Sequence, residues 1–264
     1  MNDNTASYLF QYFIDSCSKL DFHHEYIDRI IFADEENYGK EIKNINPDDD
    51  FTNSQSFRGF GKTIYLQEID KSIIIFRIEL LQLLIIMTNE NSFDKLENQV
   101  FINAFLHEIS HCKNHYIQKY SVEGGRKSLK INEIPKHYFD IIIDEYNTNR
   151  NIIVFIKKEW VFYQLKNNLI EFNSLSETML NFQDIIFVQN IWFFFKVFMD
   201  IGVFLIDYDL SEYIEILSIL NLPFDIKLLI SCFTSYNQGI ISRDILFTSL
   251  SSIVNKVLKK YYRN

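Results

Sequence analysis

Residues 101–115 read FINAFLHEISHCKNH, and this stretch decides what fold the chain should adopt. It contains no Gly or Pro, and apolar residues lead into it at helical spacing, so it predicts a helix. Residues four positions apart lie on one face of a helix, and the imidazoles of His107 and His111 can therefore reach the same ion. Glu108 follows His107 directly and is expected beside that ion.

The HExxH pattern supplies what a zinc hydrolase needs. It offers two neutral nitrogen ligands at about 2.0–2.1 Å, leaves a coordination position for water, and places a carboxylate next to that water. We expect one Zn²⁺ per chain, with His107 and His111 as ligands. Glu108 would be the catalytic base, which takes a proton from water and delivers it to the leaving amine. The alternative is a surface helix that carries these residues without a metal.

A third ligand is expected on a later helix, because a catalytic zinc site normally has three protein ligands. Residues 138–150 read YFDIIIDEYNTNR, and Pro135 suits the first turn of a helix there. Apolar residues cover most faces of this helix, and a buried carboxylate is costly unless it is paired or coordinated. Glu145 is therefore the first candidate and Asp144 the alternative. Asn149, one turn after Glu145, is placed to hydrogen-bond a ligand imidazole.

The two segments together resemble the zincin metallopeptidases of the gluzincin type. In those families the third ligand is a Glu on a later helix, often with a small residue three positions on and Asp or Asn four positions on, here Thr148 and Asn149. The resemblance extends to the intracellular ImmA/IrrE-like peptidases and the phage-exclusion protease Lit. It covers residues 97–150 and implies a strand or hairpin ahead of the HExxH helix. Metzincins carry Gly three residues and His six residues after the second histidine of the motif. This chain has Asn114 and Ile117 at those positions, which argues against that family.

The sequence also predicts roles for other side chains near the motif and near the proposed third ligand. His115 continues the histidine stripe, but a helix rises 1.5 Å per residue, which places it about 6 Å beyond His111. We interpret His115 as a helix-end or cleft residue that contacts substrate, with a metal ligand as the alternative. Cys112 is expected in the core. Peptide hydrolysis passes through a tetrahedral oxyanion, which needs a hydrogen-bond donor besides the metal. Three residues near the proposed third ligand are candidates for this donor: His137, Tyr146 and Arg150.

Composition narrows the functional class and the compartment. The chain has 264 residues, 47% of them hydrophobic, and a net charge of −9, which argues against nucleic-acid binding. Its three cysteines form no CxxC pair and no secretory signal is visible, so we expect a cytoplasmic protein. Residues 185–206 are apolar, but polar and charged residues interrupt them. They predict a buried helix rather than a membrane span, with a membrane-anchored peptidase as the alternative.

The predicted fold is α+β and predominantly helical. Residues 1–150 form the zincin-like catalytic region, with a helical segment at 6–31 and a polar, acidic loop at 33–57. Short strands at 63–66 and 72–78 form a small sheet or hairpin before the HExxH helix at 91–120, unless residues 70–87 are one buried helix. Residues 151–264 are all-helical, with breaks near Asn173, Asp207, Pro223 and Gly239. They form a separate region or pack into the same domain.

Together these patterns predict a zinc-dependent metallopeptidase that hydrolyses peptide bonds in a specific intracellular protein. The partners expected are a protein or peptide substrate, with no nucleic acid and no membrane. The alternative is a non-catalytic, zincin-fold protein that serves as a partner-binding or sensor module. An intact Glu108 argues against that alternative, because a structural site does not need it.

Overall fold

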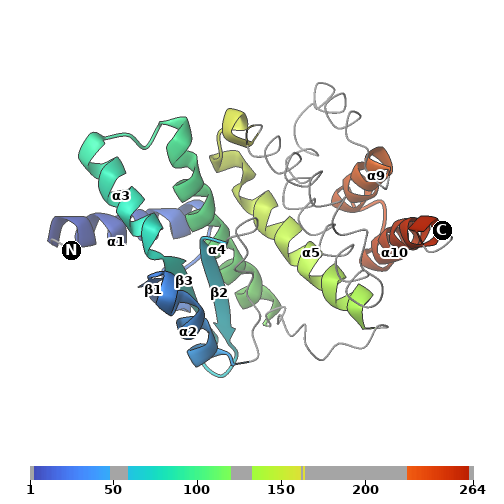
Figure 1. The fold of residues 1–264 in the computed structure, drawn as a ribbon, viewed down its shortest axis with the longest axis horizontal. Coiled ribbons are helices and arrows are strands. Elements are labelled where there is room, and N and C mark those ends of the chain that lie inside the picture. The colour runs from blue at the N-terminus through green and yellow to red at the C-terminus, as the bar shows by residue number, and fades with distance from the viewer. Residues whose placement is uncertain (1–2, 48–58, 120–132, 162, 164–224, 262–264) are drawn as a thin grey trace. The chain divides into compact units, whose positions relative to one another are not determined.

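The computed structural model of the protein describes residues 3–47, 59–119, 133–161, 163 and 225–261. The chain divides into two compact units. The first comprises Met1–Ser128 and Asn147–Trp160, and the second comprises Leu129–Tyr146 and Val161–Asn264. Within the described residues the chain is mostly helical and has one small sheet, as the α+β prediction requires (Figure 1).

The description has three gaps between elements: one after α2, one between α4 and α5, and a longer one before α9. Their bounds are α1 Asp3–Lys19, β1 Ile27–Ala33, α2 Glu35–Ile45, β2 Gly61–Leu66, β3 Lys71–Arg77, α3 Ile78–Glu90, α4 Gln99–Gln118, α5 Ile134–Ile152, α9 Ile226–Asn237 and α10 Arg243–Tyr261. Short 3₁₀ helices lie at His24–Tyr26, Leu96–Asn98 and Ile153–Phe155.

The sheet has three strands in the order β1-β3-β2. β1 runs parallel to β3, and β2 pairs antiparallel with β3 in a hairpin. Thr63 lies opposite Ile74, and Ile64 lies opposite Ile73. β3 is the central strand and its residues 72–77 are all buried, which explains the unbroken apolar run at 73–76.

Helices cover both faces of the sheet. On one face Tyr38 and Ile42 of α2 pack against Ile64, Ile73 and Ile75. Successive side chains of a strand point to opposite faces, so the intervening residues of β2 and β3 face α4. Phe76 of β3 stacks on Phe105 of α4, with 5.1 Å between the ring centroids. The HExxH helix therefore lies directly against β2 and β3 (Figure 1).

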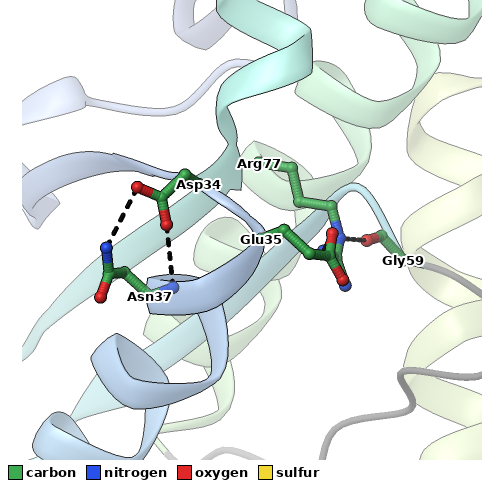
Figure 2. Close-up of polar contacts among 5 residues, drawn as sticks. All are labelled: Asp34, Glu35, Asn37, Gly59 and Arg77. Atoms are coloured by element: carbon green, nitrogen blue, oxygen red, sulfur yellow. Dashed lines mark hydrogen bonds and ion pairs between the residues drawn. The ribbon is translucent and has the colours of Figure 1, made fainter.

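The acidic segment at 33–57 was predicted to be a loop, and this is wrong for residues 35–45, which form α2. The Asp34 side chain caps the helix by accepting a hydrogen bond of 2.9 Å from the backbone N–H of Asn37 (Figure 2). Glu35 and Glu36 lie in the first turn, where negative charge stabilises a helix. Tyr38 and Ile42, four residues apart, bury the inner face. Residues 48–57 of the predicted loop lie outside the described residues.

Arg77, the last residue of β3, joins α2 to the start of β2. Its side chain is only 1% exposed. The guanidinium donates to the Gly59 carbonyl at 2.8 Å and to the Glu35 carboxylate at 2.7 Å (Figure 2). It also lies 4.2 Å from the centre of the Tyr38 ring. The backbone N–H of Arg77 donates to the Phe60 carbonyl at 2.9 Å, so both residues that precede β2 are held by Arg77.

The predicted strands at 63–66 and 72–78 are confirmed by β2 and β3, except that Ile78 begins α3. The alternative of one helix over 70–87 is wrong for residues 71–77, which form β3, and only residues 78–87 are helical. The helical prediction for residues 6–31 is correct for α1 and wrong for residues 27–31, which belong to β1. The HExxH helix was expected to begin near Asn91. It begins at Gln99. Asn91 instead ends α3 in the left-handed conformation, and the 3₁₀ helix Leu96–Asn98 directly precedes α4.

In the second unit, the first part of α5 packs on α9 and α10. The Tyr146 ring lies 5.0 Å from that of Phe233, and the Phe139 ring lies 5.0 Å from that of Phe247. Gly239, with φ of 68°, lies between α9 and α10, where the sequence predicted a break. The apolar segment 185–206 and the predicted breaks at 173, 207 and 223 lie outside the described residues. In the part of the chain that is described, no helix has both the length and the apolar character needed to cross a membrane.

Candidate metal centre

The histidine stripe of α4 is largely enclosed. His111, Glu108 and His115 are buried, and His107 is half-buried. The HExxH residues lie in the middle of a helix of 20 residues whose Phe101, Phe105 and Ile109 are also buried. The burial of this helix follows from its position between the sheet and the last turns of α5.

The two imidazoles of the motif face each other through the same ring atom. Nε2 of His107 and Nε2 of His111 are 3.1 Å apart. Two nitrogen ligands at 2.0–2.1 Å from a tetrahedral zinc ion would be separated by about 3.3 Å. The spacing of these two atoms therefore fits a shared metal ion.

The other ring nitrogens are hydrogen-bonded to α5, and the partner of His107 indicates its tautomer. Nδ1 of His107 lies 3.0 Å from Oδ1 of Asn149, an atom that can only accept a hydrogen bond. Nδ1 of His111 lies 3.2 Å from Oγ1 of Thr148. The Thr148 hydroxyl can accept as well as donate, so it is compatible with the same tautomer in His111, in which both Nε2 lone pairs point to the same place. Two acceptors so close together repel each other, and a cation between them removes the repulsion.

Glu145 lies one helical turn before Asn149 on α5. Because α5 is continuous from Ile134 to Ile152, the carboxylate lies on the face that carries Asn149. The ligand atoms of His107, His111 and Glu145 are all within 4.8 Å of one another. Two imidazoles and one carboxylate are a usual donor set for catalytic zinc.

Asp144, the alternative third ligand, belongs to another group. Its carboxylate and the ring nitrogens of His111 and His115 also lie within 4.8 Å of one another. His111 is common to both groups. The rings of His111 and His115 are 5.6 Å apart, compared with 4.7 Å for His107 and His111. The geometry thus associates Glu145 with the HExxH pair and Asp144 with His115.

Glu108 is in contact with β2, a feature that the sequence analysis missed. Oγ1 of Thr63 lies 2.8 Å from Oε2 of Glu108 and 3.0 Å from its main-chain oxygen. A Cβ atom added to Gly61 would lie 2.5 Å from Cγ of Glu108. Gly61 and Thr63 are two residues apart on one face of β2, so alternation along the strand could have identified them as a pair. Nothing in the sequence indicated that this face meets Glu108.

A polar network between α4 and the last turns of α5 was also missed. Ser110 donates to the main-chain oxygen of Thr148 at 3.2 Å, and Asn114 donates to the Thr148 hydroxyl at 2.9 Å. Asn151 donates to Ser110 at 3.0 Å and to Asn114 at 3.2 Å. These buried hydrogen bonds hold the two helices in register, and so hold Thr148 and Asn149 against the imidazoles.

Cys112 and Tyr65 lie close to the stripe without joining the ligand groups. Burial raises the pKa of the Cys112 thiol, so this residue stays protonated in the core, as expected. Tyr65, on the same face of β2 as Thr63, has its ring 6.3 Å from that of His115. Burial, followed by a hydrogen bond to Asp70, raises the pKa of Tyr65 to about 12.

The remaining predicted site residues are spread along α5. Tyr146 is buried and packs on Phe233 in the second unit, and Arg150 is exposed near the end of the helix. His137 lies in the first turns of α5, with its ring 5.7 Å from that of Tyr138. None of the three belongs to a metal-ligand group within the described residues. Their role as oxyanion donors stays a prediction.

Comparison of the chain with models of known protein families, with curated protein sequences and with solved structures finds no match. The geometry of α4, α5 and β2 is therefore the basis on which a function can be assigned.

Proposed function

We propose that the protein is a zinc-dependent metallopeptidase. The observation that carries the proposal is the convergence of His107, His111 and Glu145, whose ligand atoms lie within 4.8 Å of one another, next to a buried Glu108. The hydrogen bonds that the two Nδ1 atoms make with Asn149 and Thr148 support it further, because metal-binding imidazoles are usually oriented in this way.

In this proposal His107, His111 and Glu145 hold one Zn²⁺. When bound there, zinc supplies Lewis acidity, which makes water a better nucleophile near neutral pH and polarises a carbonyl group. Glu108 takes a proton from the attacking water on a carboxylate oxygen. It then delivers that proton to the nitrogen of the departing amine, so that the carboxylate is regenerated.

The resemblance to gluzincin-type peptidases and the position of β2 favour a polypeptide substrate. β2 lies at the edge of the sheet and pairs with β3 on one side only among the described strands. An exposed strand edge can bind an extended peptide through main-chain hydrogen bonds. This edge also carries Gly61 and Thr63, which contact Glu108. We propose a specific intracellular protein as the target.

Metal content measured by elemental analysis tests the ligand set. We expect about one zinc per chain in the wild type and in Glu108→Gln, and loss of zinc in His111→Ala and Glu145→Ala. His115→Ala and Asp144→Ala are the matched controls and should keep the metal. If Asp144→Ala loses zinc and Glu145→Ala keeps it, the third ligand is Asp144. A wild type that takes up no zinc after reconstitution contradicts the proposal and favours a partner-binding module.

Hydrolysis is tested with a library of quenched fluorescent peptides. We expect the zinc-loaded wild type to cleave a subset of the library and the zinc-loaded Glu108→Gln variant to cleave none of it, because the variant lacks the base. Cleavage by Glu108→Gln at the wild-type rate would overturn the role of Glu108.

A further inference from the structure

We propose that Gly61 and Thr63 of β2 are positioning residues for the Glu108 carboxylate, and that they leave Oε1 as the oxygen that accepts the proton. The inference rests on the proposed function, since it assigns a role within the same site. Neither residue is a candidate metal ligand, and both lie on a different element from Glu108.

The Thr63 hydroxyl holds one of the two carboxylate oxygens. Its Oγ1 is 2.8 Å from Oε2 of Glu108, and both side chains are buried, with 7% of each residue exposed. An ionised carboxylate can only accept hydrogen bonds, so the hydroxyl is the donor. Hydrogen bonds to a charged group are stronger than those between neutral groups. The same hydroxyl lies 3.0 Å from the main-chain oxygen of Glu108, so its one proton is shared between two acceptors of that residue, of which Oε2 is the nearer. The shared contact restrains Oε2 and restricts the rotation of the carboxylate.

Gly61 makes the room that this orientation needs. A Cβ atom at this position would lie 2.5 Å from Cγ, 2.9 Å from Cδ and 3.0 Å from Oε1 of Glu108. Real Cβ atoms do not approach other heavy atoms so closely, so any side chain here would push Glu108 out of its position. Gly59, two residues earlier, differs: a Cβ there would meet the Gly61 carbonyl at 3.5 Å, an ordinary contact.

The start of β2 is itself held firmly, so Gly61 cannot simply retreat. The buried Arg77 side chain donates to the Gly59 carbonyl (Figure 2). The Arg77 backbone N–H donates to the Phe60 carbonyl at 2.9 Å. On its other side Gly61 begins the ladder with β3, opposite Phe76. A substitution at Gly61 is therefore expected to move the flexible Glu108 side chain rather than the strand.

The position of the Glu108 carboxylate affects the rate of proton transfer if Glu108 is the base. Proton transfer requires the acceptor oxygen within about 2.6–3.2 Å of the water, and a misplacement of about 1 Å can cost about 10²-fold in rate. Because Thr63 occupies Oε2, Oε1 is the atom available for this transfer. A Glu with no such restraint would be distributed over several rotamers.

The kinetic test compares four variants on a peptide that the wild type cleaves. Thr63→Val removes the hydroxyl and keeps the shape, and Gly61→Ala introduces the clash. We expect both to keep about one zinc per chain and to lower kcat, by roughly tenfold or more and by about a hundredfold respectively, with little change in KM. Thr63→Ser, which restores the hydroxyl, and Gly59→Ala, the matched glycine control, should behave like the wild type. Unchanged kcat in Thr63→Val and Gly61→Ala would overturn the inference.

A second measurement needs neither zinc nor substrate. Urea unfolding is followed for Thr63→Val in the wild-type background and in Glu108→Ala. If the hydroxyl holds the carboxylate, the fall in the unfolding midpoint caused by Thr63→Val should be smaller in Glu108→Ala, where only the contact with the main-chain oxygen of residue 108 remains. An equal fall in both backgrounds shows that the contact is not made, and overturns the inference even if kcat changes.

The two proposals fail in different ways. A wild type without zinc or peptidase activity overturns the proposed function, and with it the catalytic role of this contact. A wild type that binds zinc and cleaves peptides, together with fully active Thr63→Val and Gly61→Ala variants, overturns only the positioning role of β2.

Discussion

Two neighbouring residues of α5 determine which nitrogen of each imidazole faces the candidate metal position. Oδ1 of Asn149 accepts from Nδ1 of His107, and the Thr148 hydroxyl is hydrogen-bonded to Nδ1 of His111. The contact from Asn149 is the one expected from the sequence, whereas the contact from Thr148 was not foreseen. These hydrogen bonds restrict the rotation of the rings, so both residues should contribute to the affinity of the proposed zinc site without contacting the ion.

Removal of the Asn149 amide should weaken zinc binding. For Asn149→Ala we expect a 10- to 100-fold loss of affinity, because His107 loses the partner that orients it. Affinity is measured by competition with a chromophoric chelator. Asn151→Ala is the control, since Asn151 bonds Ser110 and Asn114 but no imidazole. Equal losses in the two variants would show that the effect comes from the α4–α5 network in general.

At the scale of elements, the sequence was most informative where local pattern and tertiary burial agree. β2, β3 and most of α4 were predicted because each is a long apolar or periodic run. α2 was missed because only Tyr38 and Ile42 on its inner face are buried, and its other residues are mostly polar. Its helical state depends on the Asp34 cap and on burial against the sheet, and only the cap is visible locally.

The pairing of elements is the part that a single sequence could not provide. Gly61 and Thr63 reach Glu108 because β2 lies at the sheet edge beside α4. That position depends on strand order and register, which involve residues far apart in the chain. His107, His111 and Glu108 could be identified in advance because one helix carries all three at fixed spacing.

The cap of α2 provides a test of local stability. Asp34→Ala should lower the free energy of unfolding by about 1 kcal/mol, because the N–H of Asn37 loses its acceptor. Urea denaturation measures the change. Asp34→Ser, which keeps a capping oxygen, should recover most of the loss, and failure of Ser to do so would argue against the capping role.

Asp70, in the turn between β2 and β3, should make the stability of the protein depend on pH. Hydrogen bonds from Lys119 and then Tyr65 lower the pKa of the Asp70 carboxyl. A carboxyl whose folded pKa is lowered adds stability above its unfolded pKa, near 3.9, and loses it as pH falls through the folded pKa. Between about pH 5 and pH 2 the wild type should therefore lose more stability than Asp70→Asn. Parallel urea midpoints for the two proteins over this range would contradict the expectation.

At the scale of the whole molecule, zinc binding should appear as thermal stability. A ligand that binds only the folded state adds about 2.7 kcal/mol at a free concentration of 100 times its Kd. We expect zinc to raise the Tm of the wild type and of His115→Ala, and to leave the Tm of His111→Ala unchanged. Scanning calorimetry with and without zinc measures this. A similar rise in His111→Ala would place the binding elsewhere.

The hydroxyl of Thr63 belongs to β2, whereas the groups that orient the imidazoles belong to α5. The proposed base and the proposed ligand set are thus supported by separate parts of the chain. A protein engineer could therefore exchange the preferred ion through residues of α5 and leave the chemistry of the base intact, or retune the base from β2 with the ion unchanged. The same separation would let natural variants drift in one property without an obligatory loss of the other.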